Sequence, residues 1–164
     1  MKTLLLVRHA KSSWDAPGLS DSERTLNERG HKDGPEMAKR LKKKGLKIDA
    51  FISSPAKRAK QTADYFIEEF NGTKDQIQME AALYGAQSFT FEKVIAALPD
   101  KFSTVALFSH NTGITEYANT LTTVKTDNIP TTGIFAVQAD VDSWQAFPKA
   151  AKTFLFYDYP KKPE

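Results

Sequence analysis

The sequence predicts an α/β fold, a three-layer α/β/α sandwich around a central and mostly parallel sheet. Short apolar runs, typical of parallel strands buried on both faces, lie at residues 4–7, 50–52 and 105–108. Segments with apolar residues at helical spacing separate these runs, as in successive βαβ units. Each run also ends abruptly in polar residues, at the position where open α/β sheets bind their ligands.

Helices are predicted over residues 27–44, 54–70, 88–98 and from 111 or 112 to 121. Asn27 is a favourable N-cap for the first helix, and Gly34-Pro35 is expected to kink or interrupt that helix. Ser54 followed by Pro55 predicts an N-cap and a first helical residue for the second helix.

The C-terminal third predicts mainly strands. Residues 133–139 and 143–147 flank Asp140-Val141-Asp142, which indicates a hairpin, and residues 153–157 form an aromatic strand. A short edge strand is expected at residues 77–79. We expect one domain over residues 1–159 and a frayed tail over residues 160–164.

Composition limits the classes of partner. The 164-residue chain has a net charge of +3 and no cysteine, so disulfides and thiol chemistry are excluded and a cytoplasmic location is expected. The apolar run after Met1-Lys2-Thr3 is too short for a signal peptide or a membrane span, so no membrane association is predicted. The basic run at residues 39–44 is interpreted as the last turn of a helix, where cations complement the dipole. No nucleic-acid motif is present, and no nucleic-acid partner is predicted.

Three strand ends carry side chains suited to an anion. Arg8 and His9 follow the first apolar run, Arg58 lies in the first helical turn after the second, and His110 follows the third. If these strands are parallel neighbours, two arginines and two histidines converge on one crevice, which would form a pocket for a dianion. The first turn of a helix already favours an anion, which supports Arg58 over its lysine neighbours.

The long loop at residues 11–25 leaves the same strand end, so it is expected to line the rim of the pocket. Trp14 in this loop would either stack on a substrate or anchor the loop to the domain, and the sequence favours neither interpretation. His31 lies among charged residues of the first helix and is interpreted as a solvated surface histidine.

No metal or other cofactor is predicted. A metal hydrolase would need histidines and carboxylates at metal-ligand spacing, and a Walker A nucleotide site would need its glycine-rich loop ending in Gly-Lys-Ser/Thr. The sequence contains neither pattern.

The ordered set of motifs resembles the histidine phosphatase superfamily. The set comprises Arg8-His9-Ala10, the Ser-Pro-x-x-Arg-x-x-x-Thr pattern from Ser54 to Thr62, and Ser109-His110. The segment from Arg8 to Trp14, followed by Asp21 and Arg24-Thr25-Leu26, is similar to the small SixA-type phosphohistidine phosphatase branch, although Ala10 stands where the superfamily usually has glycine. The resemblance runs from about Thr3 to Tyr157.

This resemblance implies a phosphoglycerate mutase-like fold and specific roles for the strand-end residues. His9 would be the nucleophile, and Arg8, Arg58 and His110 would form the charge clamp on the phosphoryl group. Glu80 lies roughly where larger members place an acid, with Asp21 and Asp15 as alternatives, although Glu80 could equally be a solvated charge.

The resemblance implies a phosphatase that works through a phosphohistidine enzyme intermediate, with protein phosphohistidine as the expected substrate. A small phosphomonoester is the alternative substrate, and an inactive phosphate-binding interaction module is the alternative outside enzymes. A mutase is less expected, because the chain lacks the insertions that enclose a small substrate. The sequence does not predict the oligomeric state.

Overall fold

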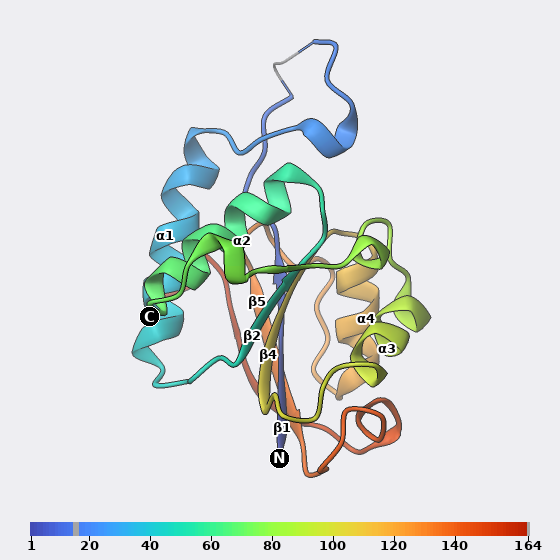
Figure 1. Ribbon diagram of the computed structural model, residues 1–164. Coiled ribbons are helices and arrows are strands. Elements are labelled where there is room, and N and C mark those ends of the chain that lie inside the picture. The colour runs from blue at the N-terminus through green and yellow to red at the C-terminus, as the bar shows by residue number, and fades with distance from the viewer. Residues whose placement is uncertain (15–16, 164) are drawn as a thin grey trace.

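The fold is a six-stranded mixed sheet with helices on both faces, seen in a computed structural model that describes residues 1–14 and 17–163 (Figure 1). The strand order is β3-β2-β4-β1-β5-β6. Strands β1 to β4 are parallel, and β5 runs antiparallel to both of its neighbours, which confirms a mostly parallel sheet. The strands are β1 Lys2–Arg8, β2 Ala50–Ser53, β3 Gln78–Met79, β4 Thr104–Ser109, β5 Ile134–Ala139 and β6 Thr153–Asp158.

Two pairs of helices form the outer layers. Helices α1 (Glu28–Lys43) and α2 (Lys57–Glu69) cover one face of the sheet, and α3 (Ser88–Ala96) and α4 (Gly113–Leu121) cover the other (Figure 1). Side chains of β1 alternate between the two layers, as expected for a strand. Leu4 and Leu6 pack in the core with α3 and α4, whereas Leu5 and Val7 pack with α1 and α2. The predicted three-layer α/β/α architecture is therefore confirmed.

Helix α1 begins where the sequence predicts. The Asn27 side chain accepts the Gly30 N–H at 2.9 Å, as an N-cap should. The expected interruption at Gly34-Pro35 is wrong, because α1 is assigned as one helix through Pro35. Packing explains why residue 34 is a glycine, since a Cβ there would lie 2.7 Å from the Tyr65 ring on α2. Gly34 is therefore a point at which α1 packs closely against α2.

Helix α2 begins later than predicted. Its N-cap is Ala56, not Ser54, and the helix itself starts at Lys57. The Ser54 side chain accepts the Ala56 N–H at 3.2 Å but also lies 2.7 Å from the His110 ring. The hydroxyl that would cap the helix therefore joins a contact with a residue 56 positions away, which sequence patterning does not show.

The hairpin prediction at residues 133–147 is wrong in its second strand. Strand β5 pairs with β1 and β6, and residues 143–147 leave the sheet. Trp144 and Phe147 are both fully buried in the core beside α3 and α4. The Trp144 Nε1–H donates to the Phe102 carbonyl at 2.7 Å. Burial of two aromatic side chains outweighs strand pairing here, while the aromatic strand predicted at 153–157 is confirmed as β6.

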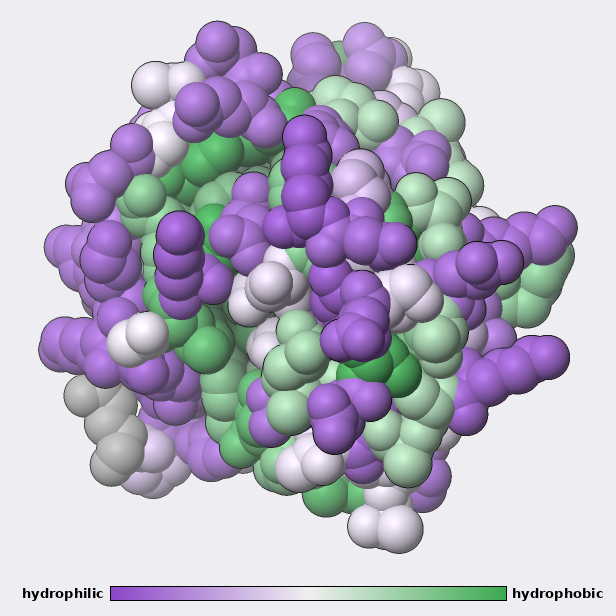
Figure 2. Space-filling model, turned by 60° about the horizontal axis from the view of Figure 1, so that its bottom comes forward, coloured by the Kyte–Doolittle hydropathy of each residue, from purple (hydrophilic) through white to green (hydrophobic). Residues whose placement is uncertain are grey.

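The remaining surface is largely polar. Figure 2 shows one face dominated by hydrophilic side chains, with hydrophobic patches and a hollow between them. In the described part of the chain, no helix combines the length and the apolar character needed to cross a membrane. Tail residues contact the body of the fold, since the Pro160 and Lys162 carbonyls accept hydrogen bonds from Arg40.

Candidate active site

The four strand-end residues lie together because β4 is between β2 and β1 in the sheet. Arg8 is the last residue of β1, His9 follows it, and His110 follows β4. Arg58 lies in the first turn of α2, directly after the β2 end. All four line one cavity of about 530 Å³ at the carboxyl ends of the parallel strands. This is the edge at which the loop between β1 and α1 projects from the sheet (Figure 1).

His9 is buried and presents one free ring nitrogen. Its Nδ1 lies 2.7 Å from the Ala10 carbonyl oxygen, which can only accept, so Nδ1 carries the proton. Nε2 therefore holds an unshared electron pair. Burial is the main reason why the pKa of His9 is lowered to about 3, and His110, Arg58 and Arg8 contribute to that lowering. A neutral imidazole at ordinary pH is the form that can act as a nucleophile.

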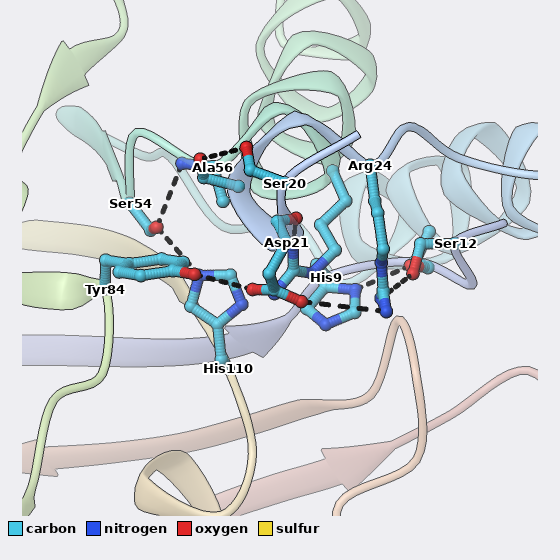
Figure 3. A network of polar contacts seen from close by, with 12 residues as sticks. His9, Ser12, Ser20, Asp21, Arg24, Ser54, Ala56, Tyr84 and His110 are labelled. Carbon is cyan, nitrogen blue, oxygen red and sulfur yellow. Dashed lines mark hydrogen bonds and ion pairs between the residues drawn. The ribbon is translucent and has the colours of Figure 1, made fainter. Parts of the chain in front are cut away.

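His110 lies beside His9, with their ring centroids 5.2 Å apart (Figure 3). Its Nε2 is 2.7 Å from Ser54 Oγ, and its Nδ1 is buried without a hydrogen-bond partner among the described residues. Burial lowers the pKa of His110 to about 4, with a further contribution from Arg58. Ser54 Oγ accepts the Ala56 N–H and still has a hydroxyl proton to donate, and we infer that it donates this proton in a hydrogen bond to His110 Nε2. Nδ1 of the neutral ring then carries the proton and is a donor.

The arginines converge on the same cavity. Arg8 donates to the Ile129 carbonyl at 2.8 Å, and its Nε is buried without a partner among the described residues. Arg58 is 5% exposed and also has an unpaired, buried Nε. Arg24 lines the cavity as a third arginine, and it donates to Ser12 Oγ at 2.5 Å. The unpaired donors give the site the capacity to bind several oxygens of an anion.

A carboxylate from the long loop organises these cations. Asp21 begins a short 3₁₀ helix, Asp21–Glu23, and its Oδ2 accepts hydrogen bonds from Arg58 at 2.9 Å and from the Tyr84 hydroxyl at 2.6 Å (Figure 3). The Arg24 guanidinium lies 3.7 Å from the other carboxylate oxygen. The Tyr84 hydrogen bond is the main reason why the pKa of Asp21 is lowered, with Arg58 contributing. Asp21 is therefore a carboxylate at neutral pH.

The structure places the other candidate acids elsewhere. Glu80 accepts the Ala82 N–H at 3.3 Å, capping the 3₁₀ helix Ala81–Leu83, and it is not among the residues that line the cavity. Asp15 lies outside the described residues. Of the three acids considered from the sequence, Asp21 is the one that the described structure brings to the histidines' cavity.

Trp14 lies at the rim of the cavity and is 79% exposed. The Arg24 guanidinium stacks 3.4 Å from its ring centroid. Trp14 therefore does not anchor the loop in the core, and its ring borders the space that a substrate would enter. His31 is exposed, as expected, and contacts the Tyr65 hydroxyl at 2.7 Å.

Sequence reasoning missed three contributors to the site. These are Arg24 and Ser54, which the sequence shows only as members of motifs and, for Ser54, as a candidate helix cap, and Tyr84, for which no role is predicted. Spacing gave a partial signal for Arg24, since it follows Asp21 at the spacing of one helical turn. Ser54 and Tyr84 act through contacts with distant residues, for which one sequence carries no signal.

The described residues contain no group of three or more histidine, cysteine, aspartate or glutamate side chains positioned to hold a metal ion. The cavity instead gathers arginine and histidine nitrogens around one carboxylate. This donor set fits a phosphoryl or similar oxyanion.

Comparisons with known proteins agree with this geometry. Residues 4–93 match the model of the histidine phosphatase superfamily (branch 1). The chain is 32% identical over 84 residues to the 2,3-bisphosphoglycerate-dependent phosphoglycerate mutase of Bartonella tribocorum, a match that covers 50% of this chain and 41% of the mutase. The chain thus spans about two fifths of the length of that relative.

Solved structures share the whole fold. The proposed phosphohistidine phosphatase SixA of Agrobacterium tumefaciens has a TM-score of 0.80 at 24% identity, covering 97% of this chain and 98% of that one. The protein histidine phosphatase SixA complexed with tungstate has a TM-score of 0.79 at 22% identity, with 96% of each chain covered. These likenesses establish a SixA-like, phosphoglycerate mutase-like fold. Together with the family match over residues 4–93, they show that this chain belongs to the histidine phosphatase superfamily.

Proposed function

We propose that this protein is a phosphatase that transfers a phosphoryl group to His9 and then to water, and that its substrate is protein phosphohistidine. The observation that carries the proposal is the free Nε2 of a neutral, buried His9 in a cavity lined by three arginines and His110. Membership of the superfamily supports phosphatase or mutase chemistry. The SixA-like fold, and the tungstate bound in one such structure, support an oxyanion site of this kind.

In the first step, His9 Nε2 attacks phosphorus in line with the leaving nitrogen of the substrate. The P–Nε2 bond forms as the P–N bond to the substrate histidine breaks. A substrate ring protonated on its other nitrogen departs as neutral imidazole. The reaction therefore makes little demand for a strong acid, which fits an Asp21 whose pKa is lowered.

The charge clamp stabilises the three equatorial oxygens of the phosphoryl group as it transfers. Arg8, Arg58 and Arg24 supply guanidinium donors, and His110 supplies its Nδ1–H. Asp21 has a positioning role in this proposal, because its carboxylate holds Arg58 and lies near Arg24. Glu80 would act as an acid only if the loop that carries it moved toward the cavity.

In the second step, water attacks the phosphorus of phosphorylated His9. The new P–O bond forms as the P–Nε2 bond breaks, and neutral His9 and orthophosphate, H₂PO₄⁻, are released. A phosphoramidate is a high-energy linkage, so the arginine clamp and an in-line water suffice for hydrolysis.

A small phosphomonoester is the second candidate substrate, and the 32% identity to a phosphoglycerate mutase favours it. The decisive experiment compares kcat/KM for a phosphohistidine-bearing protein, p-nitrophenyl phosphate and 3-phosphoglycerate. We expect the phosphoprotein to have the highest value. A metabolite turned over far better than any phosphoprotein would make the chain a phosphomonoesterase, and binding of phosphate without turnover of any substrate would make it an interaction module.

Substitution of the histidines tests the roles in the same assay. His9→Ala should abolish the acid-labile phosphoenzyme, whereas His110→Ala should slow turnover by roughly 10²–10³, the cost of one stabilising donor. His31→Ala is the matched control, because His31 is exposed and lies outside the cavity, and it should leave turnover unchanged. Acid-labile labelling that persists in the His9 variant would refute the assignment of the nucleophile. The cytoplasmic location and the absence of nucleic-acid and membrane partners stay predictions.

A further inference from the structure

Two smaller cavities adjoin the active-site cavity and share lining residues with it. One, of about 260 Å³, is lined by residues that include Lys11, Arg29, Asp33, Thr131, Tyr159 and Lys161, and we call it the basic arm. The other, of about 250 Å³, includes Gly85, Gln87, Asn111, Gly113 and Glu116, and we call it the opposite arm. Both are comparable in size to the space that one or two amino-acid residues fill.

Shared lining residues make the three cavities neighbours. Lys11 and Thr131 line both the basic arm and the active-site cavity. His110 and Asn111 line both the opposite arm and the active-site cavity. We call these three neighbouring cavities together the groove, and His110 lines both its centre and the opposite arm. A small metabolite would fill only the centre of this groove, whereas an extended chain would run along it.

The basic arm carries a positive charge. Lys11 and Lys161 are exposed, and neither ammonium group has an acidic partner among the described residues. Arg29 is held by a 3.1 Å ion pair with Asp33, whose side chain is 6% exposed, while the arginine side chain itself is 46% exposed. Asp33 thus fixes Arg29 in place and offsets one of the three positive charges of the basic arm, so a net positive charge remains. The opposite arm includes one charged side chain, the acidic Glu116.

We propose that the groove binds the polypeptide on both sides of the phosphohistidine in a phosphoprotein substrate, and that the basic arm selects acidic residues on one side. The proposal rests on the proposed function and adds to it a preference for acidic residues on one side of the phosphohistidine. Charge complementarity favours carboxylates at the basic arm, and the half-buried Tyr159, Pro130 and Pro160 supply walls against which an extended backbone packs. Remote contacts of this kind orient the reacting group in the transition state.

The test uses synthetic phosphohistidine peptides of one sequence with Asp residues on the N-terminal side, on the C-terminal side, or on neither. For the wild-type protein, we expect kcat/KM to be highest for one of the two acidic peptides, through a lower KM. Lys161→Glu should remove that preference, lowering kcat/KM for the preferred peptide roughly three- to fivefold, the scale of one exposed charge pair. The difference should shrink at high salt.

Lys47→Glu is the matched control, because Lys47 is exposed between α1 and β2, at the other end of the sheet. It should leave the preference intact, and neither variant should change turnover of p-nitrophenyl phosphate. A Lys161 variant that loses p-nitrophenyl phosphate turnover equally, or a wild type indifferent to flanking charge, would overturn the groove proposal alone. A single-stranded oligonucleotide that competes with the acidic peptide would also overturn it in favour of a nucleic-acid groove. If the wild type hydrolyses p-nitrophenyl phosphate but no phosphohistidine peptide, the proposed substrate class fails as well.

Discussion

The two active-site histidines are both neutral, yet they offer a phosphoryl group opposite chemistry. His9 donates a hydrogen bond from its Nδ1–H to the Ala10 carbonyl and so offers an electron pair at Nε2. His110 accepts a hydrogen bond from the Ser54 hydroxyl at Nε2 in our assignment and so offers an N–H at Nδ1. The Ala10 carbonyl and the Ser54 hydroxyl, which hydrogen-bond the two rings, therefore decide which histidine attacks and which stabilises.

Ser54→Ala tests this division of roles. Without the hydroxyl, the Nε2–H tautomer of His110 becomes accessible and the donor at Nδ1 is lost in part of the population. We expect kcat to fall about tenfold, with a smaller change in KM. Ser53→Ala is the control, because Ser53 is equally buried but its hydroxyl donates to the Ser54 carbonyl at 2.8 Å. Equal losses in the two variants would show that Ser54 acts only through packing.

Chelation tests the residue-level chemistry in another way. The clamp includes three arginines, whose positive charges repel a divalent cation, and every step proposed above uses side chains of this protein and water. Activity should therefore be unchanged after dialysis against EDTA. A loss of turnover that Mg²⁺ or Zn²⁺ restores would contradict the mechanism.

At the scale of elements, the sequence predicted most of what places the histidines. Apolar runs indicated β1, β2 and β4, and their polar ends carried Arg8, His9 and His110, because a buried strand and the turn after it are local features. The predicted hairpin at 133–147 was wrong because Trp144 and Phe147 pack in the core beside α3 and α4. These helices are distant in the sequence, so local patterning does not indicate that packing. The Asp21–Tyr84 hydrogen bond joins two loops 63 residues apart, and Ser54 contacts a residue 56 positions away. Alternating or helical periodicity carries no information on such contacts.

Helix α4 is positioned by a close backbone approach at its first residue. A Cβ on Gly113 would lie 1.9 Å from the Ala86 carbonyl oxygen, and backbone cannot move aside as a flexible side chain can. Because α4 begins three residues after His110, displacing it moves that ring. We expect Gly113→Ala to lower both the melting temperature and kcat.

Gly34→Ala provides the comparison for this prediction. Its Cβ would meet the Tyr65 ring at 2.7 Å, a side chain that can turn, and Gly34 lies outside the active-site cavity. It should lower the melting temperature by less and leave kcat near the wild-type value. If the Gly113 variant keeps wild-type activity, the placement of α4 does not control His110.

At the scale of the whole molecule, the two active-site histidines lower the free energy of unfolding when the solution becomes acidic. His9 and His110 have pKa values of about 3 and 4 in the folded protein because both rings are buried among cations. An unfolded chain has histidine pKa values near 6.5. Between those values the unfolded chain binds protons that the folded protein does not, so the free energy of unfolding is largest above pH 6.5 and falls as the pH is lowered toward 4.

This linkage gives a measurable prediction. From pH 8 to pH 5, each of the two histidines should remove about 2 kcal/mol from the free energy of unfolding, and the slope below pH 6 should approach, for the pair, about 2.7 kcal/mol per pH unit. Urea unfolding of the wild type and of the double variant His9→Gln with His110→Gln should therefore agree in slope above pH 7.5 and diverge below pH 6.5, the variant losing less stability. His31 is present in both proteins, so its contribution cancels.

The range from pH 5 to pH 6.5 separates the histidines from ordinary carboxylates, which titrate mainly below it. Parallel curves across that range would mean that the two rings are protonated as readily in the folded protein as in the unfolded chain. The neutral nucleophile on which the mechanism depends would then be absent at mildly acidic pH.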